Sequence, residues 1–295
     1  MVKYRFKTVD VFTDRRFGGN PLAVFPEASG IPDADMQRLA AELNLSETTF
    51  VMPPEGAANT ARVRIFNRSH EMPFAGHPLV GTAFVLARAM PEPVESLRFE
   101  VPAGLVSVRL TRQHEEVVGA IIEAPQPLTL GVTIPPEDIA EAVGLPLEAV
   151  VASNHPPTLA SVGNTYVIAE VNAHSLDHAL PDLTVFRRIR ETHEGLQGRF
   201  SLYLYARQER TISARMFAPI VGTWEDPATG SAATPLAALL LSLSGRDKDA
   251  FEIHQGVRMG RPSRLDATAW RTPEGIRASV GGRCVPVLSG EAELS

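Results

Sequence analysis

An internal repeat with a period of about half the chain is the feature that most constrains the fold of these 295 residues. Each copy begins with the pattern R-x-F, in which one residue separates the arginine from the phenylalanine. A spacer follows, then the pattern E-x-P-x-x-G, and then a run of small apolar residues. The copies are Arg64-Ile65-Phe66 with 71–76, and Arg215-Met216-Phe217 with 225–230. Solenoid units are only about 20 to 50 residues long, so this period predicts two duplicated domains.

Each repeat predicts a strand, a glycine loop and the start of a helix. Gly76 and Gly230 open the helices, and His77 and Ser231 follow them directly. A helix N-terminus presents unpaired N–H groups and the positive end of the helix dipole, which together favour an anion. We therefore expect the two termini to face each other across a cleft and to hold a carboxylate. The alternative is that both are ordinary glycine turns after strands.

Three side chains are candidates for proton transfer. Glu47 begins a predicted strand and is flanked by Leu45 and Phe50, so partial burial would raise the pKa of its carboxyl toward neutrality. His77 and Asp226 lie at or near the two loop–helix junctions. Each also has a plain structural role open to it, because surface glutamates, helix-start histidines and loop-capping aspartates are common.

Metal and hydrolase chemistry have weaker support. His70, Glu71 and His77 are near one another in sequence but lack the H-E-x-x-H spacing of a helical zinc site. Ser231, His77 and Asp226 could supply a hydrolytic triad, but the residues around Ser231 lack the second glycine of a G-x-S-x-G elbow. The sequence also has no glycine-rich nucleotide-binding turn. We expect no metal site.

The pattern along the chain favours an α+β protein over a parallel doubly wound sheet. Alternating residues predict strands near 2–12, 22–25, 47–52, 62–66, 97–123, 165–170, 201–206, 211–217 and 251–257. Helices are predicted near 33–43, 137–143 and 232–243, the first capped by Asp33 and ended near Asn44. The segment 177–188 is ambiguous. The proline-rich segment 125–136 reads as a linker, so the predicted domains are 1–127 and 128–295, with the last residues able to pack back on the first domain.

Composition and charge limit the classes of binding partner and the cellular compartment that we expect for the protein. The net charge is −6 and the sequence has no block rich in lysine or arginine, so we expect no nucleic-acid partner. The single cysteine, Cys284, excludes an intramolecular disulfide and any acid/base pair of two thiols. The N-terminus alternates like a strand, and the apolar run 232–243 is too short to cross a bilayer. We expect a cytoplasmic protein that does not enter the membrane.

Several motifs, taken together, resemble the PhzF-like family of phenazine biosynthesis, which shares its fold with diaminopimelate epimerase. They cover nearly the whole chain: Val9-Asp10-Val11-Phe12, Gly19-Asn20-Pro21, residues 44–50, 73–78 and 225–232, His254-Gln255-Gly256 and Gly260-Arg261-Pro262-Ser263. The resemblance implies two similar domains, each a mixed sheet or partial barrel around a central helix. It places the active-site cleft between the domains and implies a homodimer.

The resemblance also implies roles for individual residues. Glu47 matches the catalytic glutamate that moves a proton between carbons of the substrate, and His77 and Asp226 match polar residues that assist it. Gly76, Gly230 and Ser231 match groups that hold the substrate carboxylate. Asn20 matches a residue facing the cleft.

These expectations combine into a cofactor-independent isomerase. It would move a proton on a small, cyclic amino- or hydroxy-carboxylic acid similar to trans-2,3-dihydro-3-hydroxyanthranilate. The epimerase relatives use two cysteines, and the one cysteine here lies outside the motifs, which favours the glutamate mechanism. Two other functions remain open: an amino-acid racemase or epimerase, and a non-catalytic binder of small anions on the same fold.

Overall fold

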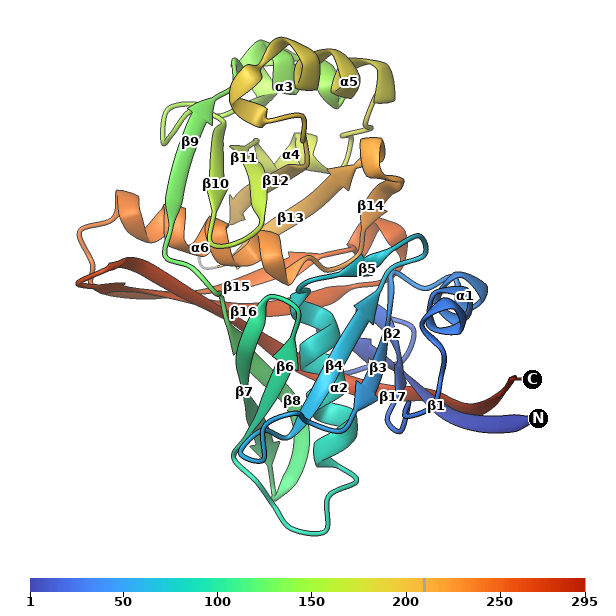
Figure 1. Ribbon diagram of the computed structural model, residues 1–295. Helices are drawn as coiled ribbons and strands as arrows, with labels where there is room; N and C mark the ends of the chain where they lie inside the picture. The colour runs from blue at the N-terminus through green and yellow to red at the C-terminus, as the bar shows by residue number, and fades with distance from the viewer. Residues whose placement is uncertain (209–210, 295) are drawn as a thin grey trace. The chain divides into compact units, whose positions relative to one another are not determined.

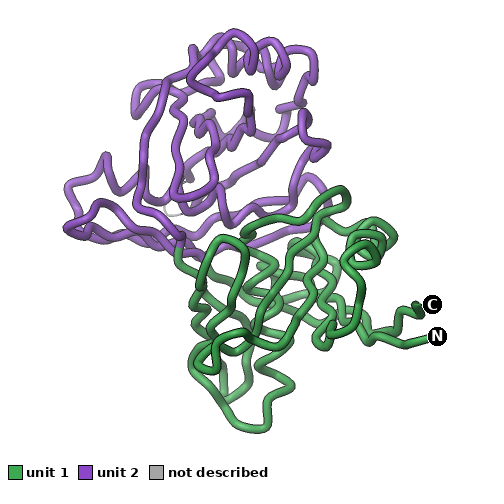
Figure 2. Tube along the Cα trace, viewed as in Figure 1, with its two compact units in different colours: residues 1–123, 281–295 green, residues 124–280 purple. Residues whose placement is uncertain are grey.

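A computed structural model describes residues 1–208 and 211–294. The chain divides into two compact units, shown in Figure 2. Unit 1 is Met1–Glu123 together with Gly281–Ser295, and unit 2 is Ala124–Val280. Each unit has its own buried helix.

Unit 1 is a closed ring of eight strands. The strands are β1 (Val2–Val11), β2 (Asn20–Phe25), β3 (Glu47–Met52), β4 (Ala61–Phe66), β6 (Ser96–Val101), β7 (Gly104–Gln113), β8 (Glu116–Glu123) and β17 (Gly275–Leu294). Each strand pairs with the next, and β17 pairs with both β8 and β1. The short strand β5 (Glu71–Met72) adds to β4. Closure leaves the ring without an open edge.

Helix α2 (Gly76–Ala87) is the core of unit 1, and all its residues except Leu86 are buried. An apolar helix of this kind needs a sheet around it, because every face must be removed from water. Gly81 sits where β1 and β2 approach the helix most closely. A methyl group at Gly81 would lie 2.6 Å from a carbon of Leu22 and 2.8 Å from one of Val11.

Helix α1 (Asp33–Leu43) covers an aromatic cluster on the outside of the ring. Phe25 and Phe50 stack with ring centroids 4.9 Å apart, and Met36 of α1 is buried in the same cluster. The expectation that Asp33 caps α1 is wrong, since Pro32 occupies the N-cap and the Asp33 carboxylate accepts a hydrogen bond from Arg64. Asn44 ends the helix with a φ of 51°.

Unit 2 wraps seven strands and the start of β17 around helix α6 (Gly230–Leu243). In pairing order these strands are β9 (Thr129–Thr133), β10 (Thr158–Ser161), β11 (Thr165–Glu170), β12 (Leu202–Gln208), β13 (Thr211–Ala218), β15 (Lys248–Gln255) and β16 (Ser263–Thr272). Strand β14 (Thr223–Asp226) adds to β13. Helix α6 packs against β15, β16, β10 and β11 (Figure 1).

A second apolar core of unit 2 lies under its shorter helices. These are α3 (Pro136–Ala142), α4 (Ala173–Leu176) and α5 (Leu183–Thr192), with the 3₁₀ turns η1 (Leu147–Ala149), η2 (Glu194–Leu196), η3 (Pro219–Val221) and η4 (Val257–Met259). Phe186 of α5 packs on Phe200 with ring centroids 4.6 Å apart. The segment that was ambiguous from sequence therefore contributes the first turns of α5.

The strand pairings confirm the duplication. From β1 to β7 the pairings run antiparallel, parallel, antiparallel, parallel and antiparallel, with β5 added to β4. The series from β10 to β16 is the same, with β14 added to β13. Helices α2 and α6 follow β5 and β14 at equivalent points. The predicted α+β class, with two similar domains built around central helices, is correct.

One expected loop is a strand. The proline-rich segment predicted as a linker contains β9, which pairs with β10. Its residues are all exposed, so no alternation of apolar and polar positions marks it in the sequence. Within residues 1–208 and 211–294, no helix combines the length and apolar character needed to cross a bilayer.

Candidate active site

The repeated arginine and glutamate form the same ion pair in both units. Arg215 of β13 donates from Nε and Nη2 to the two carboxylate oxygens of Glu225 on β14, each at 2.8 Å. Arg64 of β4 holds Glu71 of β5 in the same way, at 2.8 and 2.7 Å. The neighbouring carboxylates raise the pKa of Arg64. Each ion pair fixes the short strand from which the chain turns into α2 or α6.

The first half-site, defined as Asn20, Glu47, Gly76 and His77, lies in unit 1. Glu47 is the first residue of β3, and His77 is the second residue of α2. Glu47 Oε2 lies 3.1 Å from His77 Nε2. The two side chains are only 16% and 8% exposed, so the pair is largely shielded from water. The structure thus brings together two of the three predicted proton-transfer residues.

Burial sets the charge of this pair. It lowers the pKa of His77 to about 3, because an imidazolium would lose its hydration inside the unit. His77 is therefore neutral at physiological pH. A neutral imidazole adds no positive charge beside Glu47, and a carboxylate in this position is of the type that serves as a general base.

The N-terminus of α2 supplies hydrogen-bond donors beside this pair. Ala75, the N-cap, makes no side-chain cap, and Pro78 has no N–H. Among residues 1–208 and 211–294, no acceptor is bonded to the backbone N–H of Gly76 or His77. A methyl group added at Gly76 would meet no described atom within 4 Å. Open space therefore lies next to two backbone donors.

Asn20 stands at the start of β2 and is completely buried. It pairs with Val11 of β1, two residues before Leu22, which pairs with Glu47. The side chain thus lies near the end of β3 that carries Glu47.

The second half-site, defined as Asp226, Gly230 and Ser231, lies in unit 2. Asp226 ends β14 and is 9% exposed, while Gly230 and Ser231 are the first two residues of α6. The hydroxyls of Ser231 and Tyr166 of β11 lie 2.7 Å apart. Within the described part of the chain, the backbone N–H groups of Gly230 and Ser231 have no bonded acceptor, as at the start of α2.

Three residues of this region escaped the prediction from sequence. Thr229 donates its hydroxyl to Asp226, and Gln255 of β15 and Tyr203 of β12 bond to each other at 3.1 Å. Burial, and then the negative charge of Asp226, raise the pKa of Tyr203, which keeps it neutral. The motifs 225–232 and His254-Gln255-Gly256 contain Thr229 and Gln255 without indicating a role for either, and no sequence motif contains Tyr203.

The alternative chemistries lose their geometric basis. His70 is exposed and bonds Asn67 and Ser69, while Glu71 is held by Arg64, so the three residues of the suggested metal set do not gather. No cluster of three potential metal ligands occurs in the described residues.

The hydrolase alternative fails for a similar reason. A triad needs a bond between serine and histidine. Ser231 pairs with Tyr166, and His77 lies beside Glu47.

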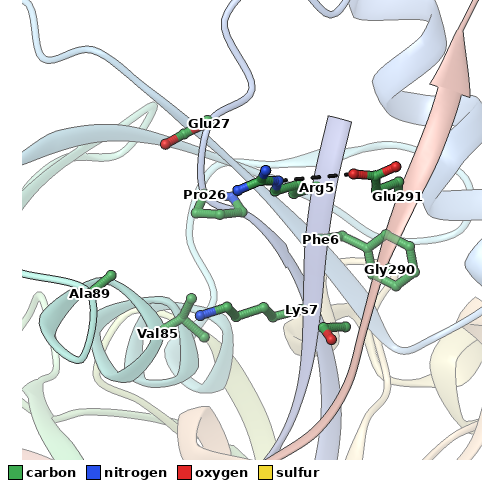
Figure 3. Close-up of a pocket in the computed structure, with 10 residues that line it drawn as sticks. Arg5, Phe6, Lys7, Pro26, Glu27, Val85, Ala89, Gly290 and Glu291 are labelled. Atoms are coloured by element: carbon green, nitrogen blue, oxygen red, sulfur yellow. Dashed lines mark ion pairs between the residues drawn. The ribbon is translucent and has the colours of Figure 1, made fainter. Parts of the chain in front are cut away.

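A groove at the other end of α2 is separate from the first half-site. Figure 3 shows Lys7 of β1 extending toward Val85 of α2, with Arg5 turned toward Glu291. The last turn of α2 contains no basic residue, and a cation beside a helix C-terminus is favourable. Lys7 can serve that structural role.

Comparison with known proteins identifies the family. The PhzC-PhzF family, described as phenazine biosynthesis-like protein, matches residues 9–290. The chain belongs to this family. Its PhzC-PhzF relatives include the trans-2,3-dihydro-3-hydroxyanthranilate isomerase of Pseudomonas aeruginosa, which is 36% identical over 99% of this chain and 100% of its own length. An uncharacterized isomerase of Mesorhizobium japonicum is 34% identical over 96% of each chain. The PhzC-PhzF chain described here is accordingly an isomerase.

Solved structures support the fold of this PhzC-PhzF protein. A predicted epimerase from Pseudomonas aeruginosa is 31% identical, with a TM-score of 0.80 over 99% of this chain and 100% of that one. A PhzF-family protein from Bacillus anthracis has a TM-score of 0.87 with full coverage of both chains, at 24% identity. A hydroxyproline epimerase from Agrobacterium vitis has a TM-score of 0.63 over 98% and 92% of the two chains, and at 12% identity shows the fold alone.

Proposed function

We propose that Glu47 is the general acid/base of an isomerase that moves a proton between two carbons of a small cyclic amino- or hydroxy-carboxylic acid. The observation that carries the proposal is the shielded pair of Glu47 and neutral His77 beside the two backbone donors of α2. The relatives from Pseudomonas fluorescens and Pseudomonas aeruginosa are named trans-2,3-dihydro-3-hydroxyanthranilate isomerase, so this compound is the proposed type of substrate.

The reaction balances without an oxidant or a reductant. Glu47 removes a proton from one ring carbon, and the electrons of that C–H bond move into the conjugated system and the adjacent carboxyl group. The carboxyl proton of Glu47 exchanges with solvent, and Glu47 then delivers a proton to a different carbon. Fixed donors near the carboxyl group lower the energy of the charged intermediate, because they are already oriented before the charge develops.

His77 has a supporting role in this scheme. Its Nε2 lies 3.1 Å from Oε2 of Glu47, so the ring can restrict the positions that the carboxylate takes. Since burial keeps the imidazole neutral, His77 does not hold Glu47 in a tight ion pair that would weaken it as a base.

We assign carboxylate binding to the backbone donors at Gly76, Gly230 and Ser231, and further polar contacts to Asn20 and Asp226. Variants of the residues in each half-site should therefore raise KM for the carboxylate substrate.

The decisive experiment follows solvent deuterium. Wild-type protein is incubated with trans-2,3-dihydro-3-hydroxyanthranilate in heavy water, and the product is examined by proton NMR. We expect deuterium in the isomerised product of the wild type and none with Glu47→Gln, which should still bind the compound. Glu42→Gln, an exposed carboxylate on α1, is the matched control and should behave as the wild type. Full exchange by Glu47→Gln would eliminate Glu47 as the base.

The finer properties are proposals of the same kind. We propose that the reaction needs no cofactor, that the protein is a homodimer and that it acts in the cytoplasm. Turnover that survives dialysis against a chelator would support the first. Sedimentation at twice the mass of 31.9 kDa would support the second, and fractionation of cells would test the third.

A further inference from the structure

Gln255 is a buried side chain whose amide is fully bonded. It is 1% exposed, and four of its hydrogen bonds are accounted for. Its Nε2 donates to the backbone carbonyl of Asp226 at 2.8 Å and to Thr229 Oγ1 at 3.0 Å. Its Oε1 accepts from Tyr203 OH at 3.1 Å and from the backbone N–H of Thr229 at 3.2 Å. We call Gln255, Thr229, Tyr203 and Asp226 the Gln255 network.

The partners fix the orientation of the amide. A backbone carbonyl can only accept and a backbone N–H can only donate, so the nitrogen of Gln255 must face Asp226 and its oxygen must face Thr229 N–H. Rotating the amide by half a turn would place like groups against each other on both sides. The direction of the remaining bonds follows from this one.

The orientation of the Gln255 amide also determines which way the Thr229 hydroxyl donates. A hydroxyl has one proton, and the Thr229 hydroxyl already accepts from Gln255 Nε2. Its proton is therefore given to Asp226 Oδ2, to which it is bonded. A carboxylate oxygen that accepts such a bond is stabilised in its ionised form and fixed in orientation.

The fold does not need this network, because the duplicated unit is built without it. When Glu71 is aligned with Glu225, Met72 of unit 1 corresponds to Asp226 and Ala75 to Thr229, and the pairings of Met72 with Ile65 and of Asp226 with Met216 agree. The parallel pairings of β4 with β6 and of β13 with β15 match Val101 to Gln255. Unit 1 thus has three apolar residues where unit 2 has three polar ones.

Other titratable groups lie around Asp226. Tyr203 on β12 and Asp226 on β14 both pair with Met216 of β13, and Tyr166 of β11 interacts with Tyr203. Arg261 follows η4, with its backbone carbonyl close to Gly256. Tyr203 donates its proton to Gln255, whereas Thr229 donates its proton to Asp226.

We propose that Gln255 and Thr229 are positioning residues that keep Asp226 ionised and oriented for the isomerase reaction. The proposal rests on the role of Asp226 in the proposed function. It gives a role to the glutamine of the motif His254-Gln255-Gly256. Gln255 donates to the hydroxyl of Thr229, and this hydroxyl in turn donates to the carboxylate of Asp226.

The test measures the protonation of Asp226 directly, without turnover. Protein labelled with ¹³C at the aspartate carboxyls is titrated by NMR, and the Asp226 signal is assigned by its loss in Asp226→Asn. Thr229→Val and Gln255→Met keep side-chain size but remove the donors. A hydrogen bond to a charged group contributes about 1.5 to 3 kcal/mol, so we expect the titration midpoint of Asp226 to rise by about one pH unit or more in both variants.

Two controls separate positioning from packing. Thr229→Ser retains the hydroxyl and should restore the wild-type midpoint. Tyr203→Phe removes another bond to the same glutamine but none to Asp226, so it should lower stability and leave the midpoint unchanged. An unchanged midpoint in folded Thr229→Val and Gln255→Met would overturn the proposal. So would an equal shift in Tyr203→Phe, or a failure of both donor-deleted variants to fold.

Turnover provides the second readout. With trans-2,3-dihydro-3-hydroxyanthranilate, the acidic limb of the kcat/KM profile should move to higher pH in Thr229→Val and return in Thr229→Ser. Shifted midpoints without any wild-type turnover would uphold the Gln255 network and refute the proposed substrate. Normal turnover, with unshifted midpoints of Asp226 and an unmoved kcat/KM profile, would uphold the proposed substrate and refute the positioning role of Gln255 and Thr229.

Discussion

Arg215 meets Glu225 through two parallel hydrogen bonds of 2.8 Å. The same guanidinium donates to the backbone carbonyls of Leu176 and Ala179 at 3.0 and 2.8 Å and lies 4.8 Å from the centroid of the Phe217 ring. The repeated arginine, phenylalanine and glutamate therefore form one unit of structure. Arg64 repeats the ion pair and the aromatic contact in unit 1, with Phe66 at 5.1 Å.

Removing the two arginines should have unequal effects on stability. Arg215→Ala leaves the largely shielded Glu225 without its partner and removes the guanidinium donor from the carbonyl of Ala179, so we expect a loss of about 3 to 5 kcal/mol. Arg64→Ala should cost less than half as much, because Glu71 is 31% exposed and can be hydrated. Urea unfolding of both variants checks this, and equal losses would show that burial does not decide the difference.

The glycine after Gln255 is needed for close packing. Gly256 has a φ of 73°, and a Cβ there would lie 2.4 Å from the carbonyl oxygen of Arg261 and 2.5 Å from that of Pro227. Gly256→Ala must displace the turn that holds Asp226, so both the thermal midpoint and kcat/KM should fall strongly. Gly260→Ala is the matched control, with a φ of 70° but open space around it. It should cost only about 1 kcal/mol in backbone strain and leave kcat/KM intact.

Gly76→Ala tests whether a ligand approaches the start of α2. An added methyl meets nothing within 4 Å in the described structure, so the free energy of unfolding should be unchanged. If the backbone donors bind the substrate carboxylate, the methyl will stand in its way and KM will rise at least tenfold. Thermal unfolding and steady-state kinetics measure the two effects. A wild-type KM would remove Gly76 from the binding site.

His77 makes stability depend on pH in a defined window. In the unfolded chain the imidazole takes up a proton below about 6.5, whereas in the folded protein its pKa is about 3. The unfolded state therefore binds more protons between these values, and stability is lost as the pH falls, by at most about 1.4 kcal/mol per pH unit. His77→Gln removes this component.

The measurement is a series of urea midpoints between pH 7 and pH 4. We expect the wild-type curve to fall more steeply than that of His77→Gln below pH 6.5. His70→Gln, which changes an exposed histidine, should keep the wild-type slope. Parallel curves for the wild type and His77→Gln would contradict a buried neutral imidazole.

Cys284 should be chemically silent in the native protein. It is 6% exposed, and burial raises the pKa of its thiol, so the reactive thiolate is scarce. We expect an aromatic disulfide reagent to label it only after denaturation, with native activity unaffected. Rapid native labelling coupled to loss of turnover would reopen a thiol mechanism.

Local patterns predicted the elements that local interactions determine. The ranges 33–43 and 47–52 agree with α1 and β3 at both ends, because periodicity and the left-handed Asn44 mark them. Glu47 and His77 were predicted separately as polar residues of the site. Their 3.1 Å contact depends on how α2 sits inside the ring, which no local pattern encodes.

The features missed from sequence depend on distant partners. Gln255 matters because β13 and β15 run parallel and bring it to Thr229, which lies in a loop far from β15 in sequence. Strand β9 depends on its ladder with β10, since its own residues are exposed and lie between prolines. In both cases the structure depends on a partner segment that the local sequence does not reveal.

The strand β17 belongs to both units, because Gly275–Val280 counts with unit 2 and the rest with unit 1. Its later part fills the gap between β8 and β1. On the ribosome, the first 123 residues must therefore wait until residues 281–294 have been synthesised before their ring can close. Nascent chains stalled just before Gly281 would carry an unfinished first unit with two exposed strand edges, and chaperones that recognise such edges should bind them.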